Sequence, residues 1–230
     1  MTGHEAVLKQ EALEALVVNE SGTYVDCTYG RGGHAEKILE RLNENGRMMV
    51  IDKDIEAINH AKQRFAGDTR VSVMHGSFRH IKSFCEEQGY SDVDGIFIDL
   101  GISSPQIDQA ERGFSFDRDG PLDMRMDQTR GETVSEWLQR AEPSDISYVL
   151  YKYGEEKFSR RIARNICTAR EAGPIETTHA LVSIIEDSIP RRDPHKHPAT
   201  RSFQALRIFI NDELGAVSYT HLRAHETDSY

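Results

Sequence analysis

Four short runs of β-branched or apolar residues alternate with helical patterns over the first hundred residues of this chain. The runs span residues 24–28, 47–52, 70–75 and 93–100. Helical spacing of apolar residues separates them, over 33–42, 54–65 and 78–88. Consecutive parallel strands need a crossover helix, so this alternation predicts a parallel sheet with helices on both faces. We expect an α/β, Rossmann-like fold for this half of the chain.

A glycine turn follows the first run, where Gly30, Gly32 and Gly33 lead into a helix that starts near His34. Such a turn lets backbone N–H groups approach a ligand, and the acidic Asp52 at the end of the second run is spaced to accept ribose hydroxyls. The pattern predicts a nucleotide-cofactor site. The pattern also fits the G-x-G-x-x-A spacing of nicotinamide-binding proteins, so at this point the cofactor could be a nicotinamide dinucleotide or another nucleotide-containing molecule.

The third and fourth runs also end in residues suited to a cofactor. Phe78 follows the third run and Asp99 ends the fourth. The carboxyl ends of neighbouring parallel strands meet at one edge of the sheet, so we expect both residues to join Gly32 and Asp52 in one crevice. Phe78 could stack on an adenine there, and packing in the core is the equally supported alternative.

After residue 100 the alternation stops, and a loop rich in Gly, Ser, Pro and Asp continues to about residue 130. Helical patterns then take over, at 133–141, 144–153, 155–170, 177–189 and 199–214. We therefore predict four parts, namely a cofactor-binding core at 1–105, an inserted helical domain at 106–198, a helix returning to the core at 199–215 and a tail at 216–230. The loop places Ser104 directly after the fourth run, where a transferred group would meet its acceptor.

Charge is distributed unevenly along the chain. The net charge is −10, but residues 151–207 hold 11 Lys and Arg against 7 Asp and Glu, a local +4 that leaves −14 elsewhere. A basic segment on an acidic body suits a phosphate backbone, and a merely solvated helical face is the alternative. The segment includes Arg160, Arg161 and Arg164, which would bind phosphates in the first interpretation and be merely solvated in the second.

The cysteines, the hydropathy pattern and the histidines indicate whether disulfides, membrane spans or metal sites are to be expected. Cys27, Cys85 and Cys167 are widely spaced and include no C-x-x-C pair, so we expect free thiols. No run of about 20 apolar residues and no basic, apolar leader is visible, which favours a cytoplasmic protein. The pair His195 and His197 has no third ligand at a suitable spacing, and we predict no metal site.

Five motifs together resemble one family, the MraW-type small-subunit (16S) ribosomal RNA (cytosine-N4)-methyltransferases. They occur in collinear order between about residues 4 and 215. The motifs are D-C-T-Y-G-R-G-G-H (26–34), D-L-G-I-S-S-P-Q (99–106), E-R-G-F-S-F (111–116), G-P-L-D-M-R-M (120–126) and H-P-A-T-R-S-F-Q-A-L-R (197–207). The long loop motifs are far more specific than the glycine turn.

The resemblance implies a class I methyltransferase sheet with an inserted helical domain. It also implies S-adenosylmethionine as cofactor and the exocyclic N4 amine of a cytidine in small-subunit ribosomal RNA, free or in the assembling subunit, as substrate. The cofactor contacts carried over are Gly32, Gly33, His34, Asp52, Phe78, Asp99 and Gln106. Gln106 comes from the resemblance alone. Ser104 is our candidate, by position, for an acceptor that orients the cytidine amine.

The chain departs from the family pattern after the motif at 197–207. Residues from about 216 onward look unlike the family and resemble out-of-frame or vector-derived sequence. We accordingly expect a truncated, inactive form whose sheet is incomplete and whose fourth strand leaves an apolar edge uncovered. A non-catalytic RNA-binding module and, less favoured, a nicotinamide-dependent oxidoreductase are the alternative functions.

Overall fold

The computed structural model of the protein describes residues 16–190 and 196–215. These residues divide into two compact units, with the boundary between Gly101 and Ile102. The first unit therefore ends close to the predicted boundary at 105. The tail from 216 and the histidine at position 195 lie outside the described residues.

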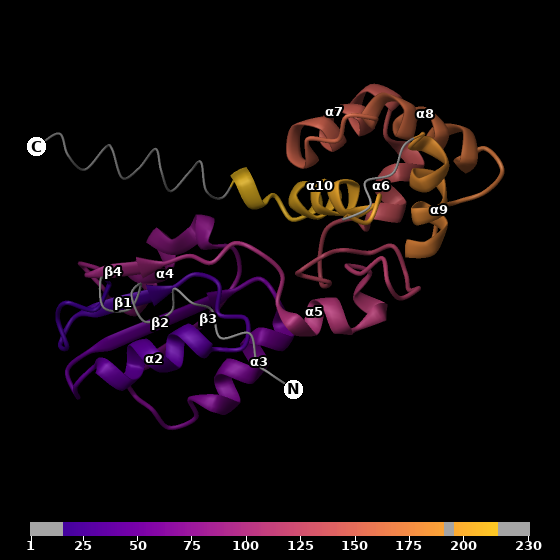
Figure 1. Ribbon diagram of the computed structural model, residues 1–230. Coiled ribbons are helices and arrows are strands. Elements are labelled where there is room, and N and C mark those ends of the chain that lie inside the picture. The colour runs from indigo at the N-terminus through magenta and orange to yellow at the C-terminus, as the bar shows by residue number, and fades with distance from the viewer. Residues whose placement is uncertain (1–15, 191–195, 216–230) are drawn as a thin grey trace, which may run out of the picture. The chain divides into compact units, whose positions relative to one another are not determined.

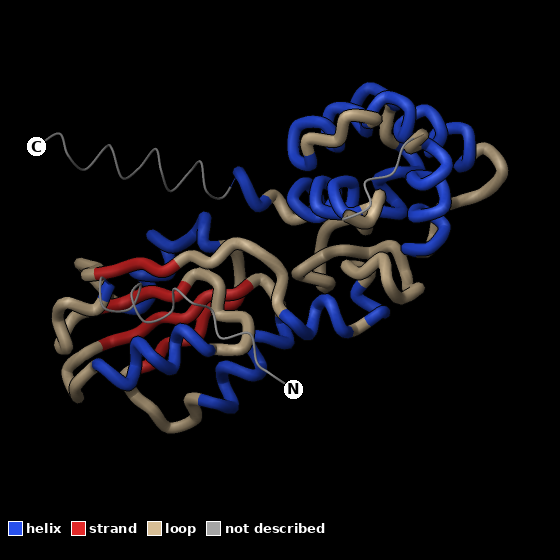
Figure 2. Tube along the Cα trace, in the orientation of Figure 1, coloured by secondary structure: helices blue, strands red, loops and turns tan. Residues whose placement is uncertain are grey.

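The first unit is built around a parallel sheet (Figures 1 and 2). Its strands follow the order β3-β2-β1-β4. They are β1 (Thr23–Asp26), β2 (Arg47–Asp52), β3 (Val71–His75) and β4 (Gly95–Phe97), and the helices between them are α2 (Gly33–Arg41), α3 (Ile55–Arg64), the 3-10 turn η1 (Phe78–His80) and α4 (Ile81–Gln88). The predicted Rossmann-like α/β fold is confirmed.

Alternation along the strands gives the sheet two buried faces. Tyr24 and Met48 join residues of α2 and α3 in one apolar cluster, while Val25 and Met49 join Phe78 and side chains of α4 in the other. Burial on both faces is usual for a parallel sheet whose crossovers are helices.

The fourth strand is shorter than the run predicted at 93–100. Its ladder with β1 pairs Gly95 to Phe97 only, and β1 itself ends at Asp26. A strand lasts only as long as its neighbour supplies hydrogen bonds, so the residues beyond Phe97 leave the sheet. Within the described part of the chain β4 pairs only with β1, and Ile96 is 49% exposed.

The second unit is helical, as predicted. It holds α5 (Ser104–Asp108), the 3-10 turn η2 (Ala110–Arg112), α6 (Val134–Arg140), α7 (Pro143–Gly154), α8 (Ser159–Arg170), α9 (Thr178–Ser188) and α10 (Thr200–Ile210). Its core is one apolar cluster to which α6 through α10 contribute. The helix expected to return to the core, α10, packs here against α7 and belongs to the second unit.

The start of α8 also differs from the expected residue 155. Glu155 has a φ of 51°, a left-handed conformation that ends α7 and that no right-handed helix can contain. The carboxylate of Glu156 then accepts a hydrogen bond from the Phe158 amide, which holds the connecting turn, and α8 begins at Ser159.

Candidate functional site

The glycine turn is joined directly to Asp52. The Gly30 amide donates to Asp52 Oδ2 at 2.8 Å, and the Asp54 amide donates to Oδ1 at 2.9 Å. A carboxylate has about four lone-pair sites, so these bonds do not by themselves exhaust its capacity to accept a ligand hydroxyl. Burial raises the pKa of Asp52, against the lowering effect of these amide bonds. The structure thus joins the glycine turn to this acid through Gly30, while the ribose contact stays a prediction.

Gly32 adopts a left-handed conformation in this turn. Its φ is +79°, and a Cβ added there would lie 2.6 Å from the hydroxyl oxygen of Tyr29. Only glycine meets both conditions without strain. Gly33 is the first residue of α2, so the turn presents the free amides of a helix N-terminus on the side where β1 ends.

A residue that the sequence analysis did not select lies at the end of β1. Asp26 is 1% exposed; its Oδ1 accepts from the Thr28 amide at 3.0 Å, whereas Oδ2 has no hydrogen-bond partner among the described residues. Burial raises the pKa of Asp26 to about 7; the Thr28 amide lowers it, and the carboxylates of Asp52 and Asp99 raise it. A buried oxygen without a partner is costly unless a ligand group satisfies it.

His34 and Asp99 meet on the same side of the sheet. His34 Nε2 lies 3.8 Å from Asp99 Oδ2, and the His34 ring stacks on Phe97 with 4.2 Å between ring centroids. The Asp99 amide donates to Thr28 Oγ1 at 2.8 Å, which ties the loop after β4 to the loop after β1. The Asp99 side chain is 68% exposed, so its carboxylate can reach a ligand.

Phe78 takes a different position. It is 6% exposed and packs with Val25, Met49 and Met74 on the face of the sheet that α4 covers. The structure therefore places Phe78 in the core, as the alternative interpretation expected, and stacking of Phe78 on an adenine stays a prediction. Ser77, just before it, caps η1 by accepting from the Arg79 amide.

The two remaining predicted residues lie at the start of the second unit. Ser104 is exposed at the first position of α5. Gln106 is buried, and its Oε1 accepts from the Ser103 amide at 3.0 Å, a contact that stabilises the helix start. The structure brings together Gly30, Asp52, Asp26, His34 and Asp99 within the first unit. Ser104 and Gln106 belong to the second unit, and their part in the site stays a prediction.

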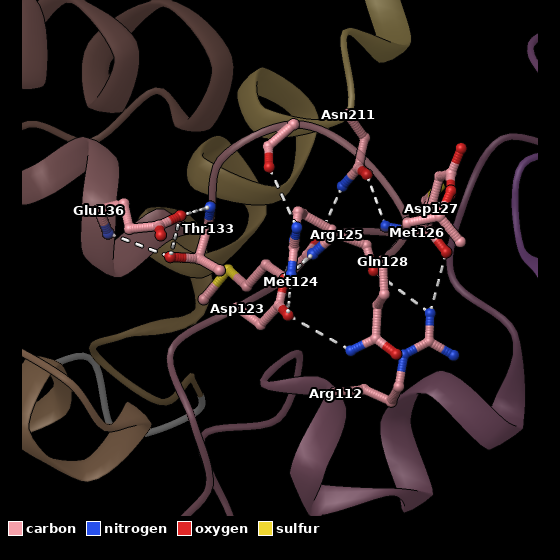
Figure 3. Close-up of polar contacts among 12 residues, drawn as sticks. Arg112, Asp123, Met124, Arg125, Met126, Asp127, Gln128, Thr133, Glu136 and Asn211 are labelled. Atoms are coloured by element: carbon pink, nitrogen blue, oxygen red, sulfur yellow. Dashed lines mark hydrogen bonds and ion pairs between the residues drawn. The ribbon is translucent and has the colours of Figure 1, made fainter.

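The second unit also contains a polar network that was not predicted (Figure 3). Arg112 is 2% exposed and donates from Nη2 to the carbonyls of Arg125 and Met126. Asn211 bonds the same loop from α10's end, donating to the Met124 carbonyl at 2.8 Å and accepting from the Met126 amide at 2.7 Å. Together they hold Met124 at a φ of 61°.

The same loop is closed by an ion pair. Arg125 Nε donates to Asp123 Oδ1 at 2.7 Å and Nη2 to Oδ2 at 2.9 Å, a bidentate arrangement visible in Figure 3. Burial acts to raise the pKa of Asp123, but the bonds from Arg125 outweigh it and the pKa is lowered. The motif at 120–126 is therefore tied into the second unit by side-chain contacts at several of its residues.

The described residues also bear on the predictions for cysteines, metal ligands and membrane-spanning helices. Cys27, Cys85 and Cys167 are free thiols, as expected. Within residues 16–190 and 196–215, no group of three His, Cys, Asp or Glu side chains could hold a metal ion. In the same part of the chain, no helix has the length and apolarity needed to cross a membrane.

Comparison with known proteins shows which family the sequence resembles. The model of the MraW methylase family matches residues 1–225. Proteins named ribosomal RNA small subunit methyltransferase H are similar to the chain: that of Halorhodospira halophila is 54% identical over 93% of this chain and 67% of its own length, and that of Thioalkalivibrio sulfidiphilus is 51% identical over 92% and 68%. The Shewanella woodyi protein is 51% identical over 92% and 67%.

Proposed function

This chain belongs to the MraW methylase family, and on that premise we propose that it transfers a methyl group from S-adenosylmethionine to the N4 amine of a cytidine in small-subunit ribosomal RNA. The observation that supports this most is the meeting of the glycine turn with Asp52 and of His34 with Asp99 at one edge of the sheet. A doubly wound sheet binds its ligand at that edge. The substrate is ribosomal RNA, free or in the assembling small subunit.

The residues present fit the cofactor. The Asp52 carboxylate lies beside the turn as an acceptor for a ribose hydroxyl, and Gly32 leaves room for close approach of a ligand to the backbone. The free oxygen of Asp26 offers an acceptor for a cationic ligand group. S-adenosylmethionine, when bound, supplies a methyl group on a sulfonium centre.

A cytidine amine is a weak nucleophile because its lone pair is delocalised into the ring. The protein's task is therefore orientation: an acceptor that bonds the amine hydrogens would point the nitrogen lone pair toward the methyl group that S-adenosylmethionine would supply. We assign this role to Ser104 and to the backbone near it. A target base must also be unstacked, which costs least in a loop or single strand.

Two measurements test the proposal. Small-subunit RNA incubated with the protein and labelled S-adenosylmethionine should, after digestion to nucleosides, contain labelled N4-methylcytidine. Label at another atom would refute the chemistry, and no label with RNA still bound would favour a non-catalytic RNA-binding module.

Cofactor binding is tested separately by calorimetry. Asp52→Ala should weaken S-adenosylmethionine binding by about 1–3 kcal/mol, the scale of a lost hydrogen bond to a charged group. Asp92→Ala removes an exposed carboxylate of the same unit and serves as the matched control. Equal affinity in both variants would remove Asp52 from the site.

A further inference from the structure

Two tyrosines stand on the exposed face of α7. Tyr148 is 58% exposed and Tyr151 is 66% exposed, and a spacing of three residues places them on one side of the helix. Their helix neighbours on that face are polar, namely Ser144, Asp145, Lys152 and Glu155. The tyrosines therefore do not belong to an apolar patch of the kind that forms the core of a protein interface.

The next helix, α8, carries four arginines and no acidic residue. Its buried residues Ile162 and Ile166 face the core, which leaves Arg160 and Arg164 on the exposed side. Of the residues that the structure describes, none forms an ion pair with either guanidinium. Arg170 is occupied differently, because it donates to the Leu138 and Ala141 carbonyls at the end of α6.

A direct contact between α7 and α8 brings the exposed tyrosines of α7 close to the exposed arginines of α8. Ser147 Oγ lies 3.3 Å from Ser159 Oγ, and these serines directly precede Tyr148 and Arg160. Since consecutive Cα atoms are about 3.8 Å apart, the Cα atoms of Tyr148 and Arg160 lie within about 16 Å of each other. Side chains as long as tyrosine and arginine can contact one short nucleic-acid strand across this distance.

We infer that Tyr148 and Tyr151 of α7, with Arg160 and Arg164 of α8, form a binding surface for single-stranded RNA, here named the α7–α8 surface. The assignment rests on the proposed function for the nature of the ligand. Exposed aromatic rings stack on unpaired bases, and arginines without a carboxylate partner bind phosphates. Asp145 and Glu155 flank the tyrosines and repel phosphate, so we assign the phosphate contacts to α8 alone.

Binding of a fluorescent single-stranded RNA of about 12 nucleotides, followed by anisotropy over a range of salt, separates the two contributions. Tyr148→Ala with Tyr151→Ala should weaken binding at least about fivefold per tyrosine and leave the salt slope unchanged, whereas the Phe replacements should retain affinity. Arg160→Gln with Arg164→Gln should reduce the salt slope by about 1.4, the value for two phosphate contacts on a single strand. Lys62→Gln with Lys82→Gln removes two charges from the first unit as the matched control.

A duplex of the same sequence should bind the tyrosine variants and the parent equally, because its bases are stacked inside the helix. Photo-crosslinking of 5-iodouridine RNA to the unaltered protein should label the peptide that contains Tyr148 and Tyr151, a result that needs no variant to fold. Unchanged affinity of the alanine variants, or crosslinks confined to other peptides, would overturn the α7–α8 surface even if methyl transfer is intact. If the parent protein binds no RNA at all, the proposed function fails as well.

Discussion

Replacing Asp26 by asparagine should stabilise the first unit at alkaline pH and not at acidic pH. The asparagine side chain keeps the shape of the aspartate and an acceptor for the Thr28 amide, but it carries no charge at any pH. The wild-type carboxyl is buried beside the carboxylates of Asp52 and Asp99, and its pKa is raised from 3.8 to about 7.

The sign follows from the protons that each state binds. Between the unfolded and folded pKa values the folded protein holds a proton that the unfolded chain has released, so raising the pH lowers the free energy of unfolding. Each pH unit in this window is worth about 1.4 kcal/mol, which gives a loss of about 3 kcal/mol between pH 5 and pH 8 for a pKa near 7. The asparagine variant should lack this loss.

Hydrogen exchange read by mass spectrometry is the suitable assay, because peptides that cover β1 and β2 report on the first unit alone. Intrinsic exchange rates cancel when the variant and the parent are compared at the same pH. The difference in protection should grow by about 3 kcal/mol in favour of the variant between pH 5 and pH 8. A difference that stays constant with pH would show that the Asp26 carboxyl does not titrate in this range, and the reasoning would be refuted.

Two further substitutions test the geometry of each unit. Gly32→Ala should lower the stability of the first unit by about 2 kcal/mol or more in a thermal melt, through backbone strain and overlap with the Tyr29 ring. Gly67 has a similar positive φ but no neighbour within 4 Å, so Gly67→Ala should cost only the backbone strain. Equal losses in the two variants would contradict the overlap at Gly32. Asn211→Leu should destabilise the second unit by about 2–4 kcal/mol, since the Met124 carbonyl and the Met126 amide lose their partners. Urea unfolding followed by Trp137 fluorescence would show this, and a change below about 0.5 kcal/mol would mean that water replaces the amide.

The sequence predicted where the first two strands end, which belongs to the fold; the site itself stays a prediction. Asp52 and Asp99 each end an apolar run, and the rule that parallel strands end together was enough to bring them to one edge with the glycine turn. Asp26 carries the same signal, an acid at the end of an apolar run, and could have been selected by it. Its burial was not predictable, because that depends on the packing of the strands on either side.

The polar network of the second unit could not be predicted from local patterns. Arg112 contacts residues 13 and 14 positions away, and Asn211 contacts Met124 across 87 positions. Neither periodicity nor composition indicates that a charged side chain will be buried, since the partners are backbone carbonyls that every residue offers. The environment of Phe78 could not be predicted for a different reason, since an aromatic residue after a strand can either stack on a ligand or pack in the core.

The strand order has a consequence for how the site forms during synthesis. β1 pairs with β2 through residues close in sequence, whereas its other neighbour, β4, arrives about seventy residues later, as the Asp99 to Thr28 contact shows. Pairings distant in sequence form slowly because the loop between them must close first. The Asp52 side of the site can therefore assemble on the nascent chain a few seconds before the Asp99 side exists, at ordinary rates of about 5–20 residues per second. Until then one edge of β1 is an unpaired template, and the interval is a window in which a chaperone or a wrong strand can occupy it.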